Sequence, residues 1–311
     1  MTADIISFGE PLFEFSQVKE SGDGPDYLSG FGGDTSNFAC SASRQGASVA
    51  VLAHLGADVF GDKFVDLWEK EGVKTDLVVR NPQAPTGIYF ISYDERGHHF
   101  TFARKGSAAS LITPDQLPED AIKNAKLLHT SAITCAISVT SCDSVFKAIE
   151  IAKANNTLTS FDTNLRLKLW GLDRARGVIH EVARHVDFIM PSVDEAELLT
   201  GLNDPDQICD FYLKLGAQNV ILKLGKQGAM YATAQERKRV AGNPVEAKDA
   251  TGAGDCFSGA FFSQIVAGKS LEDSLKYANA AAALTTQGFG AVAPIPYKAD
   301  VEAFMKERGV L

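Results

Sequence analysis

The feature that most limits how this chain can fold is an alternation of short apolar runs with longer helical patterns, which begins near residue 110. Strands are expected at Leu127–Ser131, 157–162, Phe188–Met190 and Asn219–Lys223. Helices are expected between them, at 138–155, 173–185 and 194–215. A strand followed by a helix and another strand is typical of a βαβ unit with parallel strands. The pattern therefore predicts an α/β fold, with a central, mostly parallel sheet flanked by helices.

The first third of the chain has a different pattern. Strands are expected at Leu12–Gln17, 86–93 and 98–102, and no helical pattern follows them. Such strands predict a small, partly antiparallel sheet beside the main one. Because ligands of open parallel sheets bind at the carboxyl ends of the strands, a small sheet of this kind is well placed to cover a site as a lid.

Length, composition and charge limit the domain organisation and the partners. With 311 residues, 45% of them hydrophobic, the chain can bury a large core. No linker or repeat divides it, so we expect one domain over residues 1–311, with lid strands inserted at about 11–30 and 86–107. A net charge of −9 argues against a nucleic-acid partner. Without a leader pattern or a spanning apolar run, we expect a cytoplasmic protein with no membrane partner.

The strongest chemical motif is the segment 249–255, DATGAGD, at the start of an apolar helix expected at Ala253–Val266. Its glycines let the backbone approach a ligand closely, and the first amides of a helix are free to bind an anion. Asp255 lies in the first turn, where the helix dipole favours its ionised form. A carboxylate beside an anion site suits phosphoryl transfer. The alternative is a plain helix start, in which Asp255 only complements the dipole.

A second glycine-rich segment, at residues 30–37, precedes another helical pattern. Asp34 and Asn37 project from it and could hydrogen-bond a polyhydroxylated ligand. A simple capped helix start explains the segment equally well.

At these two segments the chain resembles the ribokinase-type (PfkB) family of carbohydrate kinases, and the resemblance covers nearly the whole sequence. It implies a Rossmann-like ribokinase fold with a β-sheet lid, and the use of ATP and Mg²⁺. It also implies that Asp255 is the catalytic base, and that the anion hole consists of Gly252, Ala253 and Gly254.

Several stretches look like the 2-keto-3-deoxygluconate kinases of this family, among them 104–110 and 161–170. By that similarity, Arg166 is expected near both the substrate and the transferred phosphate. The other expected substrate contacts are Gly32, Gly33, Asp34, Asn37, Tyr89, Phe102, Arg104 and Asn164. Phe102 stands where those kinases often have tyrosine, so one hydroxyl contact is missing. The two arginines suit a sugar acid, because a guanidinium pairs bidentately with a carboxylate, although pairing with surface carboxylates is the alternative.

The same resemblance places the nucleotide against the C-terminal third of the chain. Its expected contacts are Ser192, Lys223, Gly225, Gly228 and Asn279. For the segment 223–228, a strand-turn-strand with solvated lysines is the alternative. Glu195 is expected to act on Mg²⁺ through ordered water, and Asp249 with nearby carbonyls could hold a monovalent cation such as K⁺.

These patterns favour an ATP-dependent kinase that phosphorylates a hydroxyl group of a small sugar or sugar acid, with 2-keto-3-deoxygluconate as the expected substrate. A fructokinase-like enzyme, or another ketose or nucleoside kinase, is the alternative within the family. A catalytically silent sugar- or nucleotide-binding regulator is the alternative outside enzymes, but a pure binder needs no base at Asp255. Because a lid sheet has exposed strand edges, we also expect a homodimer or higher oligomer formed through the lid.

Overall fold

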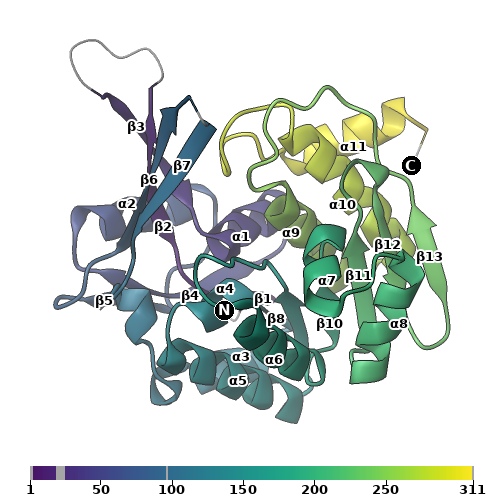
Figure 1. Cartoon of the computed structure of the whole chain (residues 1–311), viewed down its shortest axis with the longest axis horizontal. Coiled ribbons are helices and arrows are strands. Elements are labelled where there is room, and N and C mark those ends of the chain that lie inside the picture. Colours follow the sequence, from purple (N-terminus) through teal and green to yellow (C-terminus); the bar gives the residue numbers. More distant parts are fainter. Residues whose placement is uncertain (1–2, 19–24, 96, 310–311) are drawn as a thin grey trace.

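The computed structural model describes residues 3–18, 25–95 and 97–309 of the chain. These residues form a nine-stranded sheet and a separate four-stranded sheet. Figure 1 shows helices on both sides of the large sheet, while the small sheet projects at the upper left. Among the described residues, no helix combines the length and the apolar character that crossing a bilayer requires.

The large sheet has the strand order β13-β12-β11-β10-β9-β8-β1-β4-β5. All neighbouring pairs from β11 to β5 are parallel, and only the pairs β11–β12 and β12–β13 are antiparallel, so the prediction of a mostly parallel sheet is confirmed. Its strands are β1 (Ile5–Phe8), β4 (Val49–Gly56), β5 (Val78–Asn81), β8 (Leu127–Ser131), β9 (Leu158–Asp162), β10 (Phe188–Met190), β11 (Asn219–Lys223), β12 (Ala229–Ala232) and β13 (Arg237–Val240).

The first third of the chain contributes more to the large sheet than its sequence pattern predicted. It supplies β1, β4 and β5, none of which was expected, and helix α1 (Asp34–Arg44) connects the small sheet to β4. All eight residues of β4 are buried, because helices cover both faces of the sheet. A strand buried on both faces shows no polar alternation that would distinguish it from a buried helix.

The helices pack in two separate apolar cores, one on each face of the large sheet. One core includes α3 (Glu119–Asn124), α4 (Ala132–Ala136), α5 (Val139–Ala154), α6 (Leu172–Ala183), α7 (Val193–Thr200) and α8 (Pro205–Leu215). The other includes α1 (Asp34–Arg44), α2 (Val59–Lys70), α9 (Ala253–Val266), α10 (Leu271–Thr285) and α11 (Lys298–Glu307).

The helical region expected at 194–215 is two helices, α7 and α8, rather than one. Gly201 ends α7 in the left-handed conformation, with φ 75°. The side chain of Asp204 caps α8, and Pro205 is its first residue. A glycine after one helix and a proline at the start of the next are the ordinary signals for such a break.

The small sheet consists of β2 (Leu12–Gln17), β3 (Tyr27–Gly32), β6 (Gly87–Asp94) and β7 (Gly97–Ala103), in the order β3-β2-β6-β7. Strand β3 was not identified, because its two glycines weaken the strand pattern. One face of the sheet packs on α2, where Phe13 contacts Phe60 and Phe64. Residues 19–24 of the expected lid insertion lie outside the described residues.

Candidate active site

The start of α9 is fixed by a turn that only glycine can make. Gly252 has φ 73°, and a Cβ there would lie 2.8 Å from the carbonyl oxygen of Ala291. Asp249 holds the turn from both sides, since its carboxylate accepts hydrogen bonds from the amides of Thr251 and Gly290, each at 2.9 Å. These bonds lower the pKa of Asp249, although its partial burial acts in the opposite direction.

This turn leaves an anion site at the N-terminus of α9. Within the described part of the chain, the amides of Gly252, Gly254 and Asp255 donate to no protein acceptor. Free amides at the positive end of a helix bind phosphate groups well. The amide of Ala253 is not available for this purpose, because it donates to the carbonyl of Ala250 at 3.1 Å.

Asp255 lies in the first turn of α9, and its side chain faces α1. Its Oδ2 accepts a hydrogen bond from Nδ2 of Asn37 at 2.8 Å, which joins the two glycine-rich segments found in the sequence. Burial, supported by the negative charge of Asp34, raises the pKa of Asp255 to about 8. Asn37 opposes this rise by donating to the carboxylate. A carboxyl group that titrates near neutral pH is suited to accept a proton as a general base.

The start of α1 supplies a second group of polar atoms. Gly33 has φ 97°, and a Cβ there would lie 2.5 Å from the carbonyl oxygen of Glu10. Asp34 accepts a hydrogen bond from Nδ2 of Asn164 at 2.9 Å. Among the described residues, no partner is found for Oδ1 of Asp34 or Oδ1 of Asn37, although both atoms are buried. Hydroxyl groups of a bound ligand would satisfy such orphaned acceptors.

The small sheet presents Glu14, Tyr89 and Phe102 as cross-strand neighbours on one face. The Tyr89 hydroxyl donates to the Glu14 carboxylate and lies against Gly32, where a Cβ would be 2.7 Å away. The ring of Phe102 stacks on that of Tyr89, with centroids 5.7 Å apart. Glu14 was not predicted as a site residue. The polar alternation in β2, with Phe13 on the opposite face, is the signal that could have identified it.

Arg104 is close to the start of α1, but it is already paired. Its guanidinium donates to the carboxylate of Glu10, whose other oxygen accepts from the Ser107 hydroxyl at 2.8 Å. The Glu10 side chain is fully buried and that of Arg104 is 10% exposed, so the partner is not a surface carboxylate. Burial raises the pKa of Glu10, while Arg104 lowers it. Nε of Arg104 is buried and has no partner among the described residues, which leaves one donor for a ligand.

Arg166 lies in the segment that follows β9, and its side chain is 55% exposed. Its Nη1 is 3.6 Å from Oε1 of Glu195. Glu195 in turn anchors this segment, because it accepts from the hydroxyl of Thr163 at 2.7 Å and from the amide of Leu165 at 3.1 Å. It also forms a capping box with Ser192 at the start of α7. The Glu195 carboxylate is therefore well satisfied by protein donors.

Lys223, at the end of β11, forms a buried ion pair that the sequence did not reveal. Its Nζ lies 2.6 Å from Oδ2 of Asp162 at the end of β9. The Ser258 hydroxyl, from α9, donates to the same oxygen at 3.2 Å. Lys223 Nζ is also 3.7 Å from the position that a Cβ on Gly254 would occupy, so the ammonium group lies next to the anion site.

The remaining residues expected to contact the nucleotide lie along the adjoining edge of the large sheet. Gly225 and Gly228 form the turn between β11 and β12. Nδ2 of Asn279, on α10, donates to the carbonyls of Val240 and Ala241 at 3.3 and 3.2 Å. Gly228 packs against the same 240–242 segment, so the structure brings Gly228 and Asn279 together.

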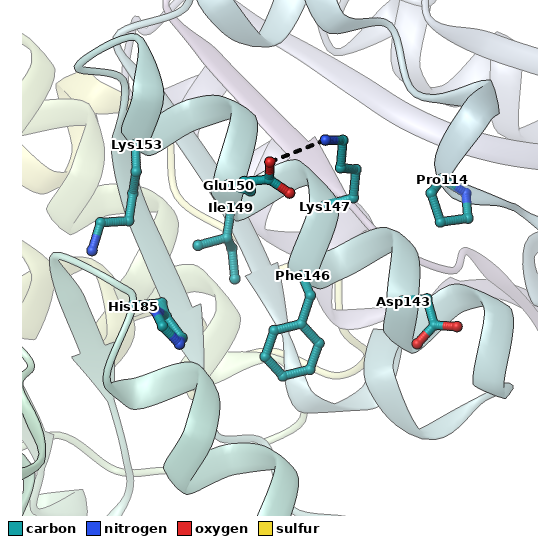
Figure 2. A pocket seen from close by; sticks show the side chains of 8 residues that line it. All are labelled: Pro114, Asp143, Phe146, Lys147, Ile149, Glu150, Lys153 and His185. Carbon is teal, nitrogen blue, oxygen red and sulfur yellow. Dashed lines mark hydrogen bonds and ion pairs between the residues drawn. The ribbon is translucent and has the colours of Figure 1, made fainter.

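A cavity of 620 Å³ lies elsewhere, along α5 (Figure 2). Figure 2 shows Phe146 between His185 and Asp143, with the Lys147–Glu150 ion pair above them. None of the residues described above lines it. The candidate active site is thus defined by converging polar groups rather than by the volume of a cavity.

Comparison with known proteins identifies the family of this chain. The sequence profile of the pfkB family carbohydrate kinases matches residues 2–298. The chain belongs to this family. It is a PfkB-family kinase that uses ATP to phosphorylate a sugar, and the ribokinase fold predicted from the sequence is confirmed.

Relatives of this PfkB kinase carry different names. The 2-dehydro-3-deoxygluconokinase of Bacillus subtilis (strain 168) is 33% identical over 312 residues, which cover 98% of this chain and 96% of the relative. Fructokinase-1 of Zea mays is also 33% identical over 312 residues, covering 96% of each chain. A crystal structure from E. coli, provisionally named Ribokinase II and in complex with ATP and Mg²⁺, superposes with a TM-score of 0.89 at 29% identity, covering 98% of this chain and 99% of the other.

Proposed function

We propose that this PfkB kinase phosphorylates a hydroxyl group of 2-keto-3-deoxygluconate, with Asp255 as the general base. The observation that carries the base assignment is the carboxylate of Asp255 beside free helix amides, 2.8 Å from Asn37 of the other glycine-rich segment. The similarity to a 2-dehydro-3-deoxygluconokinase, another name for a kinase of this sugar acid, supports the substrate.

The acceptor sugar would lie between α1, α9 and the small sheet. The orphaned oxygens of Asp34 and Asn37 would accept bonds from its hydroxyl groups. Tyr89 and Phe102 would cover it from the small sheet, which then acts as a lid and limits access of water to the phosphate. Its carboxylate would bind the free Nε of Arg104 and the exposed guanidinium of Arg166.

The donor phosphates would lie at the N-terminus of α9. The free amides of Gly252, Gly254 and Asp255 are preorganised donors, and the ammonium group of Lys223 lies next to them. Such donors act most strongly where negative charge increases during transfer. Asp255 accepts the hydroxyl proton while the bond to phosphorus forms, and the leaving group is ADP.

Mg²⁺ fits this site as an ion carried by the nucleotide. No group of three His, Cys, Asp or Glu side chains able to hold a metal is present in the described part of the chain. Mg²⁺ commonly binds phosphates and water with few protein ligands, and it would neutralise charge on the phosphates. Glu195 would act through water, as expected from the sequence, because its own oxygens already accept protein donors.

A fructokinase is the second candidate, and one observation favours it. Glu10 neutralises Arg104, so the site offers a sugar carboxylate less positive charge than two free arginines would. The identity to Fructokinase-1 equals that to the sugar-acid kinase. Four further points stay predictions: activation by K⁺ near Asp249, a homodimer formed through the lid, a cytoplasmic location and the absence of nucleic-acid partners.

An ADP-release assay with 2-keto-3-deoxygluconate, fructose, ribose, a nucleoside and no acceptor tests the proposal. We expect the highest kcat/KM with 2-keto-3-deoxygluconate. Arg166→Ala should lower kcat/KM for this sugar acid by about 100-fold, because a charge-assisted bond to the carboxylate is lost, but lower it much less for fructose. Lys168→Ala, which removes a nearby cation stacked on Phe100, is the matched control. A clear preference for fructose would favour the second candidate, and no activity on any acceptor would contradict both.

A further inference from the structure

The ion pair of Asp162 and Lys223 lies directly under the first turns of α9. The two side chains are 5% and 15% exposed. Their strands, β9 and β11, are separated by β10, so the pair spans the carboxyl edge of the sheet. Because Ser258 of α9 donates to Asp162, the pair is tied to the helix that carries Asp255.

Lys223 is close to Asp255 but does not pair with it. Its Nζ is 3.7 Å from the Cβ position of Gly254, the residue before Asp255. Within the described residues, the ion pair found for Lys223 at 4.0 Å or less is the one with Asp162. A direct contact between the ammonium group and Asp255 would stabilise the ionised carboxylate and weaken it as a base.

A buried ammonium group needs a carboxylate partner, and three surround Lys223. Asp162, Glu195 and Asp255 all raise the pKa of Lys223, which outweighs the lowering effect of its burial. Glu195 is satisfied by Thr163 and by the amide of Leu165. Without Asp162, the natural partner left for Lys223 is therefore Asp255.

We propose that Asp162 is a positioning residue that holds Lys223 away from Asp255, so that the base stays free to accept the hydroxyl proton. This inference rests on the proposed role of Asp255. It also gives a reason for a buried ion pair at this place. Apolar side chains of similar volume are often as stable in a protein interior as such a pair, so stability alone does not explain it.

The charges around the pair fix the sign of each effect. After burial itself, Asp34 and Asp162 raise the pKa of Asp255, whereas Lys223 lowers it. Tyr89, on the lid side, is neutral, since its own pKa is raised by burial and by Glu14. Below the pair, His129 is neutral, because burial lowers its pKa to about 3. Loss of Asp162 and loss of Lys223 should therefore shift the titration of Asp255 in opposite directions.

The test is the pH profile of kcat/KM for three variants. The acid limb of this profile is the pH range in which Asp255 loses its proton. In Asp162→Asn, Lys223 should pair with Asp255, so the acid limb should move to lower pH by about one unit. For the same reason, kcat at pH 9 should fall by about tenfold or more. In Lys223→Met, the acid limb should move to higher pH by about one unit, and kcat on the alkaline plateau should fall, because a donor beside the anion site is lost. The double variant D162N/K223M lacks the competing ammonium group, so its kcat should exceed that of D162N.

Glu71→Gln is the matched control, because it weakens a comparably buried ion pair with Arg44 at the far end of α1. It should lower Tm and leave the pH profile unchanged. A double variant no more active than D162N, or variants that raise only the KM for ATP with an unmoved profile, would overturn the positioning role. If melting curves show that D162N does not fold, K223M decides alone.

Asp255→Asn separates this inference from the proposed function. An active Asp255→Asn enzyme would show that Asp255 is not the base, and would contradict both proposals. If Asp255→Asn is inactive but the acid limb keeps its position in D162N and K223M, only the positioning role of Asp162 is contradicted.

Discussion

At the scale of single residues, Asp255 lowers the stability of the folded protein at neutral and alkaline pH. Asp255 is held in the folded protein beside two other carboxylates, Asp34 and Asp162, and burial raises its pKa from 3.8 to about 8. The folded chain therefore keeps a proton that the unfolded chain releases above about pH 4. Stability contributed by this group is lost as the pH rises from 4 to 8. The proposed role of Asp255 as general base would therefore be gained at a cost in stability.

Asp255→Asn should consequently stabilise the protein at alkaline pH. The amide carries no charge to bury, and its oxygen can still accept from Asn37. We expect Tm to rise by about 2 °C or more at pH 9 and to be nearly unchanged below about pH 3, where the wild-type carboxyl is protonated in both states. Scanning calorimetry across this range measures the effect.

Asp249→Asn is a control of opposite sign. Hydrogen bonds from Gly290 and Thr251 lower the pKa of Asp249 in spite of its burial, so its charge stabilises the fold above pH 4. Its replacement should lower Tm at pH 7. Equal melting curves for wild type and Asp255→Asn at pH 9 would show that residue 255 carries no buried charge.

The elements differ in how far their sequence predicts them. Helix α9 and its glycines were predicted, because a turn before an apolar helix is a local signal. The ion pairs were not, since Glu10 and Arg104 are 94 residues apart, and Asp162 and Lys223 are 61 apart. Only the strand order of the sheet brings such partners together, and a single sequence does not contain that order.

The turn at the start of α9 gives a prediction about one backbone position. In Gly252→Ala, the new Cβ would meet Ala291 at 2.8 Å in a backbone with φ 73°, so the free amides should turn away from the phosphates. We expect a loss of about 2–3 kcal/mol in the free energy of unfolding and a rise of about tenfold or more in the KM for ATP.

Gly268→Ala is the matched control at the other end of α9. Gly268 has a similar φ of 81°, but a Cβ there meets nothing within 4 Å. It should lose about 1 kcal/mol from backbone strain and keep the KM for ATP unchanged. If both variants changed the KM for ATP equally, the Gly252 turn would have no special part in holding phosphate.

For the whole molecule, the topology explains why one sheet edge and one small sheet meet over α9. Strand β2 directly follows β1, and β6 follows β5, so the large sheet itself delivers strands of the small sheet to its carboxyl edge (Figure 1). The sequence predicted the parallel sheet and the small sheet. It missed β1, β4 and β5, because buried parallel strands and buried helices have similar apolar patterns.

The central claim is that one carboxylate, Asp255, removes the proton of the acceptor hydroxyl at the mouth of α9. Its most direct test compares single-turnover phosphorylation and ATP binding, by calorimetry, in wild type and Asp255→Asn. We expect phosphorylation to fall by at least about 1,000-fold while the Kd for ATP changes less than about threefold, because the amides that hold phosphate remain. An Asp255→Asn enzyme that phosphorylates sugar at a rate near wild type would contradict the claim.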